Sequence, residues 1–545
     1  MPTTPPAASP DISATPVPAS THAQNQTEVF AVHGADPEVL AYAMAKYSRS
    51  SLSMRQSLRE ISSQRAEQFL NTFYFQYGHR SIADLAHVAF AIERLSLLAA
   101  IVLVDEQRWD GQERSTRYQN FLKSGWYLPN FDEAEEARQL YIETVEGLFA
   151  SYATTSAAVL EALKARVACP AGMAPDAYER TLKARAFDVA RYLLPLATNT
   201  SLGQIVNART LETQVSRLLS HPAAEIRDLG EKLKQAATGP AWNLHAEANA
   251  SLRAKIVGLG SDVAPGLAEE SEQLLTRVVH ASPTLVKYAQ PNPYEQQSRA
   301  ELTQAASELL GDLPIAAAPV VDLVERTESL EVELAATLIY SASHHPYRQI
   351  RDLVAGLSYA RVAEIVEIGM RSRGRHDELL RAFHAGAHLR FDILMDIGGF
   401  RDMHRHRRCT QIIQEFTHLH GYETPQAADL PGDSAILAEA GILSEYRRSM
   451  EAAHAASRKI AAGNAPEAAQ SALYLLPLAT RIRALFKMDF AEAVYISELR
   501  SASAGHFSYR QVAWEMYLAV QRQHPSLAKY FRVTDFTEPI DILKR

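Results

Sequence analysis

The heptapeptide Tyr-Leu-Leu-Pro-Leu-Ala-Thr occurs twice in the chain, at residues 192–198 and again at 474–480. A hydrophobic helix with a proline near its start would not require the same seven letters at both places. A second parallel keeps the same order: an apolar run, a polar turn and an amphipathic helix ending in Tyr-Ser occur at 29–48 and at 320–341. The two repeats indicate a tandem duplication whose halves have diverged.

Each half is longer than a solenoid repeat, so we predict two homologous domains. Helical periodicity dominates both halves, with a few strand-like runs, which favours an α+β fold with long helices and a small sheet in each domain. Turn residues between the halves alternate with helical stretches and indicate a partly helical connector. The predicted order is a disordered leader (1–28), an N-terminal domain (29–235), a connector (236–318) and a C-terminal domain (319–545).

The bulk composition excludes several classes of protein. The chain has 545 residues, a formal charge of −8 and a pI near 6.2, which argues against a general nucleic-acid-binding coat. Two cysteines form no disulfide framework and suggest a reducing compartment. The leader has no Lys or Arg and no long apolar run, so it resembles neither an export signal nor a transit peptide. The most apolar stretch, Leu95–Val104, is too short to span a bilayer and predicts a buried helix. We therefore expect a cytoplasmic protein that binds neither membrane nor nucleic acid.

Arginine and histidine side chains crowd the stretch FRDMHRHRRCTQIIQEF at 400–416. Fixed cations at this density repel one another unless an anion or carboxylates lie nearby, so the cluster around Arg405-His406-Arg407 is a candidate anion site. A solvated basic surface is the plain alternative. A metal site that uses Cys409 and the neighbouring histidines is less favoured, because arginines are interleaved and no second cysteine is near.

Taken together, the ordered motifs resemble the flavin-dependent thymidylate synthase family. The first half carries GHRSIADLAHVAF (78–90), ERSTRY (113–118), Arg191 before the heptapeptide, NAR (207–209) and Arg217-x3-His221-x3-Glu225-Ile226. The second half carries Arg-His-Arg at 405–407, flanked by RAFHAGAHLRFDI (381–393) and ELRSASAGHFSYR (498–510). The resemblance covers roughly residues 29–235 and 320–535. Any one of these motifs alone would be weak; their common order is more specific.

The resemblance implies a chemistry and a set of residues. Members transfer a methylene group from a tetrahydrofolate to C5 of dUMP, with a hydride from reduced FAD and NADPH as the reductant of the flavin. By resemblance, the catalytic residues are Ser115 and Arg217, and the nucleotide-binding residues are Glu113, Arg117, Arg191 and Arg217. The FAD-binding residues would be His79, Asn207, His221, Arg405, His406, Arg407, Arg500 and His506. Because the family forms homotetramers, two duplicated chains could supply four domains, and we expect a homodimer.

The sequence departs from the family signature, which is Arg-His-Arg, seven residues, then Ser. The first half has Asp105-Glu106-Gln107 followed by Ser115, and the second has Arg405-His406-Arg407 followed by Glu415. Each half thus keeps the part that the other has lost. Either the halves pack as a pseudo-dimer with composite sites, or both sites have decayed to a non-catalytic nucleotide- or flavin-binding protein.

The surroundings of three charged side chains can also be predicted. Arg191 and Arg217 stand on otherwise apolar helices, where an unpaired guanidinium is costly, so each should have a ligand or a carboxylate partner. Glu415 could neutralise the cations of 405–407 from within the chain.

Overall fold

The structure is a computed structural model that describes residues 34–45, 80–258, 267–311, 313–325, 328–374, 377, 379–385, 387–425, 435–464, 467–539 and 541–543. The predicted leader, the apolar run before residue 33, Tyr47-Ser48 and the candidate His79 lie outside these residues. No described helix is both long and apolar enough to cross a lipid bilayer.

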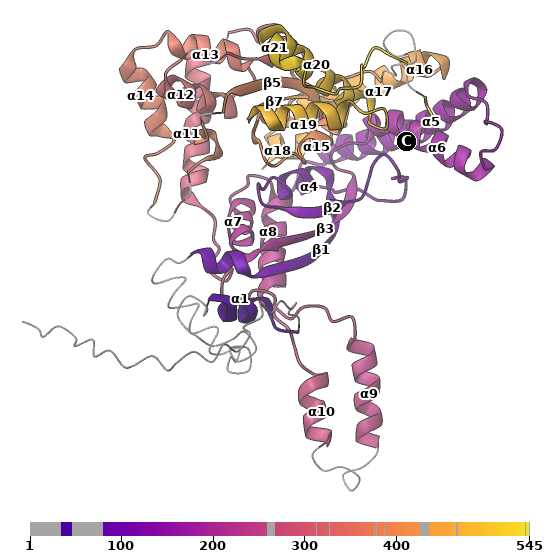
Figure 1. Ribbon diagram of the computed structural model, residues 1–545, viewed down its shortest axis with the longest axis vertical. Coiled ribbons are helices and arrows are strands. Elements are labelled where there is room, and N and C mark those ends of the chain that lie inside the picture. Colours follow the sequence, from indigo (N-terminus) through magenta and orange to yellow (C-terminus); the bar gives the residue numbers. More distant parts are fainter. Residues whose placement is uncertain are drawn as a thin grey trace, which may run out of the picture. The chain divides into compact units, whose positions relative to one another are not determined.

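The first half is built on a three-stranded antiparallel sheet (Figure 1). Its strands are β1 (His87–Ser96), β2 (Asp110–Glu113) and β3 (Asn199–Asn207), and β3 lies between the other two. Helix α1 (Pro37–Ala45) and a short 3-10 helix, η3 (Arg80–Leu85), precede the sheet. The remaining elements are α4 (Leu97–Leu103), α5 (Glu135–Arg166), α6 (Pro175–Ala190), η4 (Arg191–Leu193), α7 (Ala208–Leu219) and α8 (Ala224–Thr238).

The second half repeats this order around the sheet β4-β5-β7-β6. Its strands are β4 (Val321–Leu323), β5 (Leu389–Asp396), β6 (Thr410–Ile413) and β7 (Arg481–Met488). Helices α12 (Leu330–Ser341), α13 (Tyr347–Ala355), α14 (Tyr359–Ile368) and η5 (Arg381–Phe383) lie between β4 and β5 in the chain. The others are α15 (Ile397–Met403), α16 (Ala435–Glu439), α17 (Leu443–Ala461), α18 (Ala468–Leu473), α19 (Phe490–Ser501), α20 (Phe507–Gln523) and α21 (Pro525–Ala528). The predicted α+β fold of two homologous domains is confirmed.

Equivalent capping residues start equivalent helices. Ser96 accepts a hydrogen bond from the Ala99 amide at the start of α4, and Asp396 accepts one from the Gly399 amide at the start of α15. Each satisfies an amide that the first helical turn leaves free. Both helices directly follow a strand, so the predicted helix at Leu95–Val104 is observed as α4, with its first two residues closing β1.

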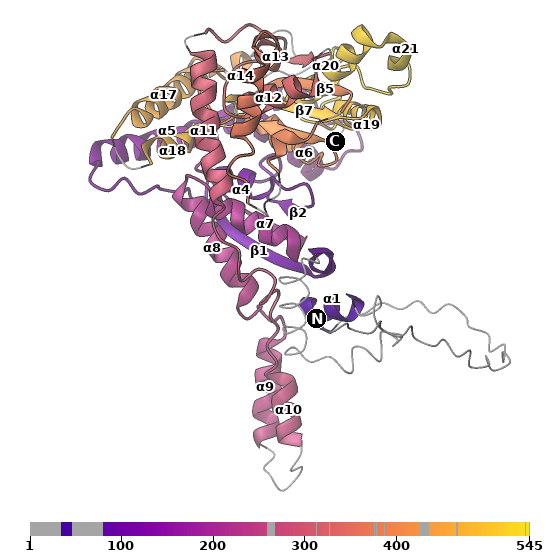
Figure 2. The same cartoon turned by 90° about the vertical axis from the view of Figure 1, so that its left-hand side faces the viewer.

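The connector contains α9 (Ala246–Gly258), α10 (Leu267–Leu275) and α11 (Pro293–Leu310). Helices α9 and α10 run antiparallel: Asn249 donates to the Leu275 carbonyl, and Arg253 pairs with Glu272 at 2.6 Å. Both views show them side by side (Figures 1 and 2). Helix α11 instead packs through Leu302 and its neighbours against α12 and α14, in a separate hydrophobic cluster on the second sheet.

The two heptapeptides pair with each other where the halves meet. Pro195 and Pro477 face one another in an antiparallel bridge. The amides of Leu196 and Ala197 donate to the carbonyls of Leu476 and Tyr474, and the equivalent amides of Leu478 and Ala479 donate to Leu194 and Tyr192. Alongside, α5 packs on α17, with Ser151 and Ser449 hydroxyls 2.8 Å apart. One continuous hydrophobic core therefore runs through both halves.

Candidate functional site between the halves

The two parts of the divided signature follow equivalent helices and meet each other. Residues 105–107 follow α4, and residues 405–407 follow α15. His404, just before the Arg-His-Arg stretch, places Nε2 3.0 Å from the Asp105 carboxylate. The signature positions of both halves therefore line one junction.

Carboxylates in the first half neutralise arginines of both halves. Asp105 forms an ion pair with Arg381, in addition to its contact with His404. Burial alone would raise the pKa of Asp105, but Arg381 and His404 outweigh it and the pKa is lowered. Glu106 pairs with Arg217 at 2.7 Å. On this side of the junction, the charges that could attract an anion are already compensated.

Three arginines of the second half have no such compensation. Within the described residues, Arg405, Arg407 and Arg500 form no ion pair. Arg500 Nε donates to His406 Nε2 at 2.7 Å, and Arg407 stacks over the Trp109 ring at 4.5 Å. Burial, followed by Arg500, Arg407 and Arg405, lowers the pKa of His406 to about 3, so the imidazole is neutral. Glu415 is exposed and makes no ion pair with a described residue, so the expectation that it neutralises this cluster is wrong.

A cavity of about 450 Å³ opens at this cluster. Residues from both halves line it: His87, Gln107, Arg108, Trp109, Asp110, Ile205, Val206, Asn207, Arg405 and Arg407. The first sheet contributes residues from one end of its strands, since His87 begins β1, Asp110 begins β2 and Asn207 ends β3. Two of the three lining arginines, Arg405 and Arg407, come from the second half. Three arginines face one carboxylate, so the cavity favours an anionic ligand. Its volume lies within the range of small-molecule sites.

The ERSTRY loop packs against the second half beside this cavity. Glu113 forms an ion pair with Arg401. Arg117 pairs with Asp188 at 2.7 Å and donates to the Tyr509 hydroxyl at 2.8 Å. The Ser115 hydroxyl accepts the Arg117 amide at 3.2 Å, in a turn, and does not cap a helix.

Arg191, expected in the nucleotide site, is nearly inaccessible and only partly neutralised. Its side chain is 2% exposed, with Asp402 at 3.4 Å. Its Nε and one Nη have no hydrogen-bond partner among the described residues. The expectation of carboxylate partners for Arg191 and Arg217 is confirmed by Asp402 and Glu106.

A chain of contacts links the two parts of the signature. His406 accepts from Arg500, Arg500 lies 5.6 Å from the Tyr509 ring, and the Tyr509 hydroxyl accepts from Arg117, two residues after Ser115. The Ser115 loop and the Arg405 loop are therefore parts of one connected region. Tyr509 lies within the ELRSASAGHFSYR motif, but sequence spacing alone does not show that its hydroxyl reaches the other half.

The remaining candidates lie at different distances from the cavity. Asn207 caps α7 through the Thr210 amide at 2.8 Å and also lines the cavity. His221 accepts the Ala223 amide and does not line it. Burial and nearby arginines lower the pKa of His221 to about 3. His506 is fully buried, caps α20 through Ser508 and contacts the Asp188 carbonyl at 2.9 Å. His221 and His506 thus hydrogen-bond to the backbone of elements outside the cavity.

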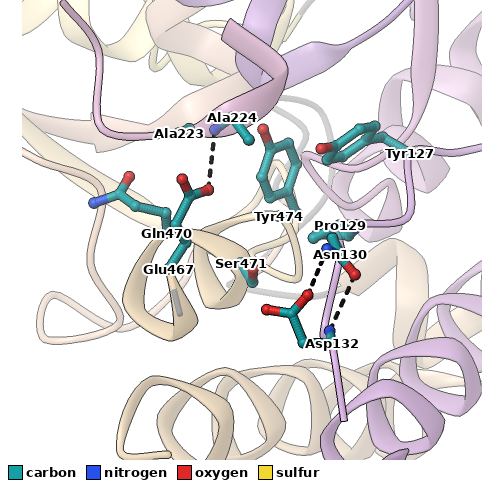
Figure 3. A pocket seen from close by; sticks show the side chains of 10 residues that line it. All are labelled: Tyr127, Pro129, Asn130, Asp132, Ala223, Ala224, Glu467, Gln470, Ser471 and Tyr474. Carbon is teal, nitrogen blue, oxygen red and sulfur yellow. Dashed lines mark hydrogen bonds between the residues drawn. The ribbon is translucent and has the colours of Figure 1, made fainter. Parts of the chain in front are cut away.

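A second cavity between the halves has the opposite character (Figure 3). It measures about 220 Å³ and includes Tyr127, Asp132, Glu467 and Tyr474 in its lining. Glu467 already accepts the Ala224 amide at the start of α8. Among the described residues that line it there is no Lys or Arg, so this cavity does not suit a phosphate. For an anionic ligand, the cavity at Arg405 and Arg407 is the better candidate.

No cluster of three or more potential metal ligands occurs in the part of the chain that the structure describes. The Cys409 thiol donates to the His406 carbonyl, and burial raises the pKa of Cys409 to about 12.

The fold and site define a duplicated α+β protein with an arginine-rich cavity between its halves. The chain matches the family described as thymidylate synthase complementing protein over residues 30–239 and 322–526. It therefore belongs to that family, the ThyX family, as a divergent member with a domain in each half.

Several known proteins are similar to it. A UPF0159 protein of Chlamydia muridarum is 28% identical over 537 residues, covering 92% of this chain and 91% of that protein. A UPF0159 protein of Thermoplasma acidophilum is 24% identical, covering 90% and 94%. The flavin-dependent thymidylate synthase of Clostridium tetani is 25% identical over 200 residues, covering 36% of this chain and 76% of that protein. A crystal structure of Helicobacter pylori ThyX complexed with FAD and dUMP covers 37% of this chain and 89% of that one, at 17% identity and a TM-score of 0.25.

Proposed function

We propose that this protein is a cytoplasmic, FAD-dependent thymidylate synthase-like enzyme with one composite site per chain. It would transfer a one-carbon unit from methylenetetrahydrofolate to C5 of dUMP, with NADPH as the reductant, and would act as a homodimer. Family membership supports the reaction class. The main observation in support of the binding site is the open cavity lined by Arg405 and Arg407, which form no ion pair with a described residue.

The cavity residues fit the phosphate end of a flavin dinucleotide. Arg407 keeps a buried Nε without a partner among the described residues, and Arg405 is exposed at the cavity wall. Arginines hold diphosphate oxygens with paired donors, which a lysine does not match. Trp109 and Asn207 would supply an aromatic wall and an amide. When bound, reduced flavin supplies the hydride for the reaction.

The nucleotide would lie toward the Ser115 loop, on the side of Arg191. Arg191 is 2% exposed and only partly neutralised by Asp402, so its remaining positive charge would favour an anionic group on that side without contacting it. Cations near the pyrimidine ring would stabilise the negative charge that develops when C5 is activated. Arg117 and Tyr509 would hold the Ser115 loop in position.

Only one of the two pseudo-equivalent sites would bind ligand. The counterpart of Arg405-His406-Arg407 is Asp105-Glu106-Gln107, whose two carboxylates are engaged by Arg381 and Arg217. Replacing cations by carboxylates at a phosphate site converts attraction into repulsion. We therefore expect one flavin per chain.

A non-catalytic flavin- or nucleotide-binding protein is the second candidate, and one observation favours it. Arg117 and Arg217, both expected to hold the nucleotide, are paired with Asp188 and Glu106 of the same chain. If those pairs persist with ligand present, the protein would bind flavin without dUMP turnover.

The experiment is to add FAD to the purified full-length protein, measure bound flavin, and follow NADPH oxidation with and without dUMP. The enzyme predicts one flavin per chain and faster NADPH oxidation when dUMP is present. Bound flavin with no response to dUMP supports the second candidate. A protein that neither contains nor takes up flavin would overturn both the cavity assignment and the enzyme.

A further inference from the structure

The helical hairpin α9–α10 and the segments that flank it carry apolar side chains that no described residue covers. Trp242 is 85% exposed, Leu244 73% and Leu274 73%, and Val278 and Val279 are exposed as well. We call these five residues the hairpin patch. The Ala241 amide donates to the Val279 carbonyl at 2.8 Å, so the chain entering α9 runs beside the chain leaving α10. The patch therefore lies at one end of the hairpin, where both segments meet.

The hairpin gains little stability from its own contacts. No residue of α9 is buried. Two polar contacts join it to α10: Arg253 with Glu272, and Asn249 with the Leu275 carbonyl. Short helices in water need an apolar face packed against a partner, and exposed pairs such as Arg253–Glu272 contribute little. Exposed tryptophan and leucine beside two such helices mark a contact surface.

We propose that this surface binds the same surface of a second copy of the chain, so that two hairpins form a four-helix bundle. The remaining charges of the two helices favour this occupant. Arg253 and Glu272 pair with each other within the chain, but α10 also carries Glu269 and Glu270 without any Lys or Arg, and the last turn of α9 carries Lys255. A two-fold arrangement lays α10 of one copy along α9 of the other.

This pairing sets Glu269 and Glu270 of one chain near Lys255 of the other, while the hairpin patches cover each other. Four antiparallel helices around a shared apolar centre are a stable arrangement, whereas two are not. The acidic α10 also disfavours nucleic acid as the occupant. The inference rests on the proposed homodimer and names its contact surface; it is independent of flavin binding.

The test is the mass of the full-length protein by size-exclusion chromatography with light scattering over a range of concentrations. The chain has a mass of 60.3 kDa, so the expected species has twice that mass. Trp242→Glu and Leu274→Glu should each weaken dimerisation at least tenfold. Tyr359→Glu is the matched control, because that side chain is 78% exposed on α14, outside the hairpin; it should leave the dimer intact.

A charge exchange tests the orientation. Lys255→Glu and Glu270→Lys should each weaken the dimer, and the double variant should restore it, with circular dichroism confirming that all variants are folded. A monomeric wild-type chain overturns both the homodimer and this surface. An oligomer that the Trp242 and Leu274 variants leave unchanged overturns the surface alone. Flavin content, measured on the same samples, reports separately on the proposed enzyme.

Discussion

Pro195 and Pro477 face each other at the centre of the junction, and the hydrogen bonds around them obey a two-fold relation. Each heptapeptide is the binding partner of the other. A change in one copy would disturb a contact made by both, which gives a physical reason for the two copies to stay the same. The signature positions nearby face no such constraint, and there the halves differ: Asp105 stands where the second half has Arg405.

The first prediction concerns this junction. Leu196→Ala and Leu478→Ala remove equivalent, fully buried side chains, and each should destabilise the protein by about 2–5 kcal/mol, because a cavity remains. The two losses should be similar, and urea unfolding followed by fluorescence measures them. Leu330→Ala, at a half-exposed position that begins α12, is the control and should cost well under 1 kcal/mol. Very different losses for the two equivalent leucines would contradict the two-fold junction.

The second prediction concerns the anion cavity. Arg405→Ala and Arg407→Ala should each weaken FAD binding by about 10- to 100-fold, since each removes charge-assisted hydrogen bonds to phosphate. Equilibrium titration with FAD measures the change, and the affinity should fall as salt rises. The neighbouring Arg408 pairs with Asp489 and does not line the cavity, so Arg408→Ala is the matched control. If all three variants lost FAD affinity equally, the cause would be the general loss of positive charge and not a binding site at Arg405 and Arg407.

The sequence predicted the duplication and the fold class because identity and helical periodicity are local properties. It could not predict that the two heptapeptides bind each other, because the sequence of a segment does not show which other segment it will contact. It indicated that Arg191 and Arg217 need partners, since an isolated charge on an apolar helix is costly. The identity of those partners, Asp402 and Glu106, depends on how the loops fold back. Glu415 was the obvious carboxylate by proximity in sequence, yet it points to solvent.

The cavity was only half predictable for the same reason. Arg405 and Arg407 stood out by charge density, and Asn207 by its motif. The cavity positions of Trp109 and His87 could not be predicted from the sequence. The two residues belong to the first half, and they meet Arg405 and Arg407 only when the halves pack together. Tyr509 joins the two loops through a hydroxyl whose reach no spacing reveals.

The third prediction tests whether the two loops form one site. Ser115→Ala and Arg405→Ala should each reduce dUMP-dependent NADPH oxidation, and the double variant should lose little more than the worse single one. Tyr509→Phe removes only the hydroxyl that accepts from Arg117 and should lower the same activity about 10-fold or more, without loss of flavin. Fully additive losses of Ser115 and Arg405 would separate the loops into independent sites.

The fourth prediction concerns the compensated side of the junction. Glu106→Ala leaves the largely buried Arg217 without its carboxylate and should destabilise the protein by about 3 kcal/mol or more. The double variant Glu106→Ala with Arg217→Ala should recover part of that loss, because no charge is then stranded. Arg108→Ala, whose side chain is largely exposed, is the control for charge removal nearby. The stabilities of the wild type, Glu106→Ala, the double variant and Arg108→Ala are compared by their urea midpoints. A double variant that is no more stable than Glu106→Ala would argue against the ion pair.

The last prediction is a pH dependence at the junction. His454 on α17 is 5% exposed, and its Nε2 lies 2.9 Å from the Thr480 hydroxyl. Burial, with His418 and Arg458 nearby, lowers the pKa of His454 to about 4 from 6.5. Between these values the unfolded chain holds a proton on this imidazole that the folded chain lacks. Stability from this group is therefore full above pH 6.5 and is lost as the pH falls toward 4, at up to about 1.4 kcal/mol per pH unit.

His454→Gln should flatten the fall in the urea midpoint between pH 6.5 and pH 4 by an amount matching one proton. The exposed His245→Gln is the control and should leave the slope of the wild-type chain unchanged. The sign is decisive, because a histidine that gained a carboxylate partner on folding would stabilise the protein at low pH instead. An unchanged slope in His454→Gln, with the midpoint at neutral pH preserved, would show that the proton is taken up elsewhere in the junction.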